Sequence, residues 1–203
     1  MANYIEFGAV MNHSEELASL GKCALIVTGK HSAKANGSLQ NVTDALEKYA
    51  IKYAVFDQVE ENPSIETVMA ARDIGVAAGA DFIIGIGGGS PMDAAKAIAV
   101  MIKNADNGWE LLYEAEQVGG LPVVCVPTTC GTGSEVTAVS VLTRHDLKTK
   151  VTAKQKLFPT LSLVDPGYLE KAGLEMIRTT SIDAMGHMIE SYINTGATDE
   201  SRG

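Results

Sequence analysis

The sequence predicts an α/β fold: a Rossmann-like, doubly wound, mostly parallel sheet with a β-hairpin, followed by the start of an all-helical second domain. Three observations support this prediction. Short apolar runs alternate with helical patterns, a glycine-rich turn joins one such run to a helix, and the pattern changes after Pro127. The chain has 203 residues, of which 46% are hydrophobic, so it is long enough to bury a sizeable core.

Four short runs, nearly all apolar, predict strands buried on both faces, as in a parallel sheet. They cover residues 23–28, 53–56, 82–86 and 123–126. Apolar residues at helical spacing lie between them, in segments 39–49, 64–79 and 91–104. We expect Ser64 to cap the second of these helices and Pro91 to stand in the first turn of the third. Repeated strand–helix–strand units of this length favour a doubly wound sheet.

After Pro127, residues 136–143 and 149–153 flank a polar segment and predict a β-hairpin, and residues 161–164 predict another buried strand. From Leu174 onward the pattern is helical, with a broad apolar face formed by Ile177, Ile182, Met185, Met188, Ile189 and Tyr192. Because such a face must pack on something, we expect the chain to end just inside a second, helical domain.

The formal net charge of −9 argues against nucleic acid or an anionic membrane surface as a partner. Cys23, Cys125 and Cys130 lack the CxxC spacing of metal or redox motifs, and neither a signal peptide nor a long apolar span is visible. These features favour the cytoplasm.

The segment FIIGIGGGSPMDAAK places Gly85, Gly87, Gly88 and Gly89 between a strand and a helix. Glycines let an anion approach the backbone closely, and the free N–H groups of the helix N-terminus, which we expect Ser90 to cap, favour negative charge. The turn therefore predicts a diphosphate site. The alternative is a tight strand-to-helix turn with glycines kept for packing alone. The turn is also not a clean G-x-G-x-x-G fingerprint, since Ser90 stands where that motif has its last glycine.

The segment PTTCGTGSE, residues 127–135, is a hydroxyl-rich loop that leaves a buried strand. It can offer backbone N–H groups and hydroxyls to a ribose, phosphate or amide, or it is an ordinary exposed polar turn. Within it, we expect Cys130 to be a small buried thiol rather than a nucleophile.

Asp183 and His187 stand four residues apart on the last predicted helix, so both project from one face and could share a metal ion. Two ligands do not make a site, and an Asp/His pair at this spacing is, taken alone, more often a surface hydrogen bond.

The order GGGSPMDAAK, PTTCGTGSEVT, Asp-Pro and SIDAMGHMIESY resembles the iron-containing (group III) alcohol dehydrogenases along essentially the whole chain. This resemblance implies a dinucleotide-binding α/β domain over residues 1–172 and the first helix of a truncated helical metal-binding domain over residues 173–203. It also implies that Asp183 and His187 are metal ligands, and hence catalytic residues. The family's two further histidine ligands have no counterpart in this sequence.

The resemblance also implies a set of cofactor contacts. Gly87, Gly88, Gly89 and Ser90 match the pyrophosphate loop, with Asp93 one turn on, Thr128, Thr129 and Thr132 in the loop at the nicotinamide side, Lys150 at a ribose, and Asn62 and Leu169 at the adenine. Gly29 stands where NAD-specific members tend to carry an aspartate, and Ser32 follows it, so NADP is expected to be preferred over NAD.

The implied activity is hydride transfer between NAD(P) and a primary alcohol or aldehyde, with Fe²⁺ or Zn²⁺ as Lewis acid. The chain would then be the cofactor-binding part, inactive by itself, of an enzyme that is a homodimer when full length. Two alternatives stay open: a glycerol-dehydrogenase- or dehydroquinate-synthase-like enzyme, and a nucleotide-binding module without catalysis.

Overall fold

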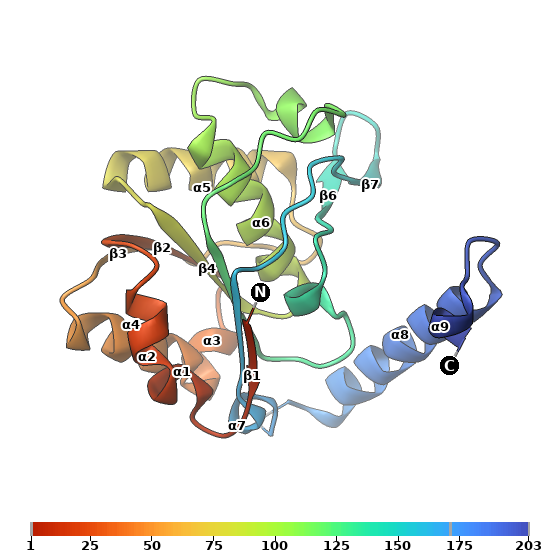
Figure 1. The fold of residues 1–203 in the computed structure, drawn as a ribbon, viewed down its shortest axis with the longest axis horizontal. Helices are drawn as coiled ribbons and strands as arrows, with labels where there is room; N and C mark the ends of the chain where they lie inside the picture. The colour runs from red at the N-terminus through yellow and green to blue at the C-terminus, as the bar shows by residue number, and fades with distance from the viewer. Residues whose placement is uncertain (1, 171, 203) are drawn as a thin grey trace.

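The computed structural model describes residues 2–170 and 172–202, and its centre is a six-stranded sheet in the order β1-β8-β5-β4-β2-β3 (Figure 1). Each neighbouring pair of these strands is parallel. The strands are β1 (Ala2–Ile5), β2 (Cys23–Thr28), β3 (Lys52–Phe56), β4 (Phe82–Gly87), β5 (Val123–Pro127) and β8 (Leu161–Val164). The predicted doubly wound α/β fold is confirmed.

Helices cover both faces of this sheet. They are α1 (Ala9–Asn12), α2 (Ser14–Ala18), α3 (Ser32–Asn36), α4 (Ser38–Lys48), α5 (Ile65–Ala78), α6 (Gly89–Lys103) and α7 (Pro166–Leu169). Two more helices, α8 (Leu174–Ile193) and α9 (Asp199–Arg202), follow them along the chain. Two 3₁₀ turns, η1 (Trp109–Tyr113) and η2 (Ser134–Val136), and an antiparallel hairpin of β6 (Val141–Arg144) and β7 (Thr149–Thr152) complete the described elements.

Alternate residues of each central strand enter two separate cores. In β2, Leu25 and Val27 pack with α5 and α6, whereas Ala24 and Ile26 pack with α1 to α4 and α7. Figure 1 shows these two helix groups on opposite sides of the sheet. Burial on both faces explains why the strands are nearly continuous apolar runs.

Capping residues set the bounds of α5 as predicted. The Ser64 hydroxyl accepts the Thr67 N–H at 3.2 Å, and Gly79 ends the helix in the left-handed conformation at φ +70°. Helix α6 differs from the prediction, because it begins at Gly89 with Gly88 as its N-cap. Ser90 is thus inside the first turn, and its hydroxyl accepts the backbone N–H of Asn62 instead.

The hairpin is also shorter than predicted. Its first strand begins at Val141 rather than residue 136, because the η2 turn and the segment after it come first. Val141 pairs with Thr152, so the hairpin itself is confirmed.

Helix α8 extends away from the sheet (Figure 1). Its six predicted apolar-face residues are all exposed, from Ile177 at 42% to Ile182 at 68%. Among the residues that the structure describes, no helix combines the length and apolarity that a membrane span requires.

Candidate cofactor-binding site

The glycine-rich turn lies at the carboxyl end of β4, against the hydroxyl-rich loop that follows β5. A Cβ atom on Gly88 would lie 2.9 Å from Thr129 Oγ1, and one on Gly89 would lie 3.1 Å from Thr132 Cγ2. Gly87 has φ +147°, a conformation that favours glycine. The turn thus brings bare backbone and two hydroxyl groups together.

The strand order reverses beside this turn. From β2 the chain passes to β3 on one side and then crosses back to β4 on the other. The switch point therefore lies between the carboxyl ends of β2 and β4, at Gly29 and Gly87. In open α/β sheets, ligands bind in the crevice outside the strand ends at this point.

A cavity of about 980 Å³ opens at the N-terminus of α6. Its walls come from the turn before α5, the first turn of α6, the loop after β5, the hairpin and α8. The lining residues are Glu61, Asn62, Pro63, Gly89, Ser90, Asp93, Gly131, Thr132, Gly133, Ser134, Thr137, Val139, Val141, Lys150, Asp183, Ala184, His187 and Met188. The volume is ample for a dinucleotide portion and a small substrate.

The cavity brings eight of the predicted site residues together: Asn62, Gly89, Ser90, Asp93, Thr132, Lys150, Asp183 and His187. The others do not line it: Gly29, Ser32, Gly87, Gly88, Thr128, Thr129 and Leu169. Thr129 and Leu169 instead line a smaller cavity of about 140 Å³ beside Cys130 and α8. Cys130 is exposed, so the expectation of a buried thiol was wrong: it lies in a loop facing α8, not in the core.

Asn62 is held in the left-handed conformation, with φ +58°, by contacts at both of its backbone groups. Its N–H donates to Ser90 Oγ at 3.1 Å, and its carbonyl accepts the Thr143 hydroxyl at 2.8 Å. The turn before α5 is therefore fixed to both α6 and the hairpin, which holds one wall of the cavity in place.

Asp93 lies in the cavity wall with both carboxylate oxygens hydrogen-bonded to protein donors. Oδ1 accepts the Ser134 hydroxyl and lies 3.0 Å from Lys96 Nζ, and Oδ2 accepts the Val141 N–H at 2.9 Å. Lys96 was not singled out from the sequence. The only signal was its position three residues after Asp93 on the inner side of α6.

Asp183 and His187 face the same cavity from α8, with Oδ1 and Nε2 3.9 Å apart. A metal ion bonds such atoms at about 2.0–2.2 Å, so one ion can reach both. Their side chains are 47% and 54% exposed. The residues in 2–170 and 172–202 form no group of three or more His, Cys, Asp or Glu side chains that could hold a metal ion.

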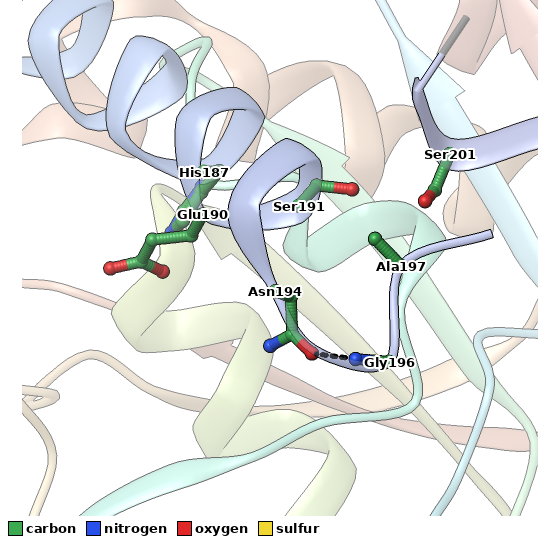
Figure 2. Close-up of a pocket in the computed structure, with 7 residues that line it drawn as sticks. All are labelled: His187, Glu190, Ser191, Asn194, Gly196, Ala197 and Ser201. Carbon is green, nitrogen blue, oxygen red and sulfur yellow. Dashed lines mark hydrogen bonds between the residues drawn. The ribbon is translucent and has the colours of Figure 1, made fainter. Parts of the chain in front are cut away.

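The other face of α8 and the loop before α9 border an open hollow of about 390 Å³, which His187 also lines (Figure 2). There the Asn194 carboxamide accepts the Gly196 N–H at 2.8 Å and is turned into its own loop. His187 and Glu190 point away from that loop. This hollow lies at the carboxyl end of α8, apart from the glycine-rich turn.

On the β2 side of the switch point, Gly29 follows the strand. A Cβ atom added to Gly29 would lie 3.4 Å from the Val59 carbonyl oxygen. Lys34 Nζ pairs with Asp57 Oδ2 at 2.5 Å, and this pairing lowers the pKa of Asp57. Positive charge thus lies near the end of β2, already shared with one carboxylate.

The strand order and the glycine-rich turn at the switch point define a Rossmann-like doubly wound α/β protein. The profile of the iron-containing alcohol dehydrogenase family matches residues 2–166. This chain belongs to that family.

Three relatives illustrate the match. The chain is 36% identical over 170 residues to the long-chain primary alcohol dehydrogenase of Thermoanaerobacter ethanolicus, covering 82% of this chain and 43% of the relative. It is 33% identical over 201 residues to the NAD-dependent methanol dehydrogenase of Bacillus methanolicus, covering 97% and 52%. A crystal structure of an iron-containing alcohol dehydrogenase from Thermotoga maritima superposes with a TM-score of 0.92 at 39% identity, covering 98% of this chain and 55% of that one. The chain therefore spans about half the length of the curated relatives it matches.

Proposed function

We propose that this chain is the cofactor-binding part of a metal-dependent oxidoreductase that transfers hydride between NADP and a primary alcohol or aldehyde. The observation that carries the proposal is the meeting of the glycine-rich turn with Asp183 and His187 around one cavity of about 980 Å³. A dinucleotide site and a pair of metal ligands in one cavity are what this reaction requires.

The diphosphate is assigned to the N-terminus of α6. Gly88 and Gly89 leave space there that side chains would fill, and the helix N–H groups and dipole favour an anion. In this arrangement Thr129 and Thr132 offer hydroxyls beside the phosphates and nicotinamide, and Lys150 offers a cation from β7 toward a ribose. Gly29, Ser32, Asn62 and Leu169 are assigned to the adenosine half.

Asp183 and His187 fit a divalent metal as two of its ligands, and Fe²⁺ or Zn²⁺ suits a carboxylate with an imidazole. When bound, the metal supplies a Lewis acid that polarises an alcohol or carbonyl oxygen. The chain's own contribution is to hold these two ligands and the dinucleotide on facing walls of one cavity, so that the orientation of the reactants is set in advance.

The preference for NADP rests on Gly29. An aspartate there would hydrogen-bond the ribose 2′-hydroxyl and repel a 2′-phosphate, whereas glycine leaves space and removes that charge. Ser32 offers a hydroxyl and Lys30 a positive charge to the added phosphate, and Lys34 is shared with Asp57.

A binding titration tests the proposal. Calorimetry on the 203-residue chain, shown to be folded by circular dichroism, should detect NADP binding at up to millimolar concentration and weaker NAD binding. Gly88→Asp should abolish both, because it places a carboxylate against Thr129 and the phosphates. Gly29→Asp should reverse the preference toward NAD. A folded chain that binds neither cofactor refutes the proposal, and equal affinities for both in the wild type refute the NADP preference alone.

The expected compartment, substrate size and oligomeric state rest on the composition of the whole chain rather than on the site residues. The net charge and cysteine pattern favour a cytoplasmic enzyme that acts on small molecules, and we expect a homodimer for the full-length protein. The two alternatives predict different behaviour. A glycerol-dehydrogenase- or dehydroquinate-synthase-like enzyme would turn over polyols or a cyclic substrate, and a module without catalysis would bind a nucleotide with no activity at any length of chain.

A further inference from the structure

Lys96 is the most deeply buried charged side chain in the described part of the molecule, at 1% exposure. It lies on the inner side of α6. Its ammonium donates to the Ser134 hydroxyl at 2.9 Å and to the Ser134 and Thr137 carbonyls at 3.1 and 3.3 Å. It also donates to the Val139 carbonyl and lies 3.0 Å from Asp93 Oδ1. Burying a cation is costly, and these acceptors offset the cost of removing the ammonium from water.

All four residues that Lys96 contacts line the large cavity. Asp93 belongs to the first two turns of α6, while Ser134, Thr137 and Val139 belong to the segment that runs from the hydroxyl-rich loop to the hairpin. The Lys96 side chain therefore links the two walls through its hydrogen bonds, although it does not line the cavity itself. Segment 134–141 has little regular structure of its own, only the three-residue η2 turn and the start of β6. Its Ala138 and Ser140 carbonyls accept backbone N–H groups from residues after the hairpin, whereas side chains make its hydrogen bonds to α6.

We infer that Lys96 is a positioning residue of the cofactor site: it sets the position of segment 134–141 against α6 and, through it, the affinity for the dinucleotide. Lys96 does not touch the cavity, so it acts through Asp93 and the carbonyls that it binds. This inference rests on the proposed function, because it concerns the same cavity. It adds a determinant of affinity that lies outside the cavity lining.

A buried polar cross-link can also matter for stability alone, and Gln155 provides a matched control. Its side chain is 4% exposed and donates to the carbonyls of Glu114 and Glu116 at 3.1 and 2.6 Å. It also accepts the Val118 N–H at 3.1 Å. Gln155 is thus a second buried side chain that joins loop backbone groups, but it does not line the cavity.

The experiment compares Lys96→Met and Gln155→Met in the 203-residue chain. Thermal melting first establishes that each variant is folded and by how much its midpoint falls. NADP affinity is then measured by calorimetry, and hydrogen–deuterium exchange is measured over residues 134–141. We expect both variants to melt earlier. Lys96→Met should lose affinity by about tenfold or more and exchange faster over 134–141, whereas Gln155→Met should stay within about twofold of the wild-type affinity.

Several outcomes overturn the inference. Wild-type affinity in folded Lys96→Met does so, as does an equal loss of affinity in Gln155→Met or unchanged exchange over 134–141 in Lys96→Met. If Lys96→Met does not fold, Lys96→Arg, which keeps the charge but changes the geometry of its bonds, is measured in the same way and should still lose affinity. A wild-type chain that binds neither NADP nor NAD overturns the proposed function and the affinity claim together, which distinguishes that failure from the failure of Lys96 alone.

Discussion

The substitution Gly85→Ala tests how closely β4 and α6 pack. Gly85 lies in the middle of β4, paired with Val27 on one side and Cys125 on the other. An added Cβ would lie 2.8 Å from Ala95 Cβ and 3.2 Å from both Met92 Cα and the Pro91 carbonyl oxygen. Ordinary carbon–carbon contacts lie near 3.5–4.0 Å, so α6 would have to move away from the sheet by most of an ångström.

Backbone atoms make up part of this obstacle, so a change of rotamer cannot relieve it. Overpacking of a dense core by one methyl group costs about 1–3 kcal/mol. For a chain of this size each kcal/mol lowers the melting temperature by about 2–4 °C, so Gly85→Ala should melt about 2–12 °C below the wild type. Circular dichroism at 222 nm during heating measures this change.

Gly29→Ala is the matched control for stability. It lies at the end of the neighbouring strand β2, and its added Cβ would meet only the Val59 carbonyl at 3.4 Å, an ordinary contact. We expect its melting temperature to stay within about 2 °C of the wild type. If Gly85→Ala melts no earlier than Gly29→Ala, the close approach of β4 and α6 is wrong.

Three further predictions concern the metal pair, the thiols and a helix cap. After dialysis the 203-residue chain should hold iron or zinc far below one ion per molecule by elemental analysis, because Asp183 and His187 are only two ligands, and stoichiometric metal that survives a chelator would contradict this. In a Cys23→Ser background, which removes the one partly exposed thiol, a thiol reagent should label exposed Cys130 quickly but Cys125 only on unfolding, because burial raises the pKa of Cys125 to about 12. A fast phase that persists when Cys130→Ser is added would argue against the assignment. Ser64→Ala should cost about 1 kcal/mol and lower the melting temperature by a few degrees, since the Thr67 N–H loses its acceptor, and an unchanged melt would show that the cap contributes nothing.

The sheet was predictable because its strands are buried on both faces. Every predicted run of the parallel sheet, from residue 23 to residue 164, became a strand. Strand β1 was not predicted, because its residues alternate between half-buried and exposed and include the polar Asn3. Helices α1, α2 and α3 have four or five residues each, too few to show a helical period.

The start of α6 shows how tertiary contacts override a local capping rule. Ser90 is the best N-cap residue in the turn, but its hydroxyl is used by the Asn62 N–H from a different loop. Lys96 was missed for a related reason. Its role depends on hydrogen bonds to carbonyls about 40 residues further along the chain. Every residue carries a backbone carbonyl, so the amino-acid sequence does not show which carbonyls will accept such a bond.

The pairing of β1 with β8 has a consequence for how the chain folds during synthesis. Ala2 is paired with Leu161 and Ile5 with Val164, so β1 has no partner in the sheet until residues 161–164 have been synthesised. Strands β2 to β5 can assemble from segments close in sequence, whereas the backbone groups of β1 stay unpaired until β8 is present. We therefore expect its docking to be a late step, and chains shorter than residue 164 to present this strand to chaperones or to one another.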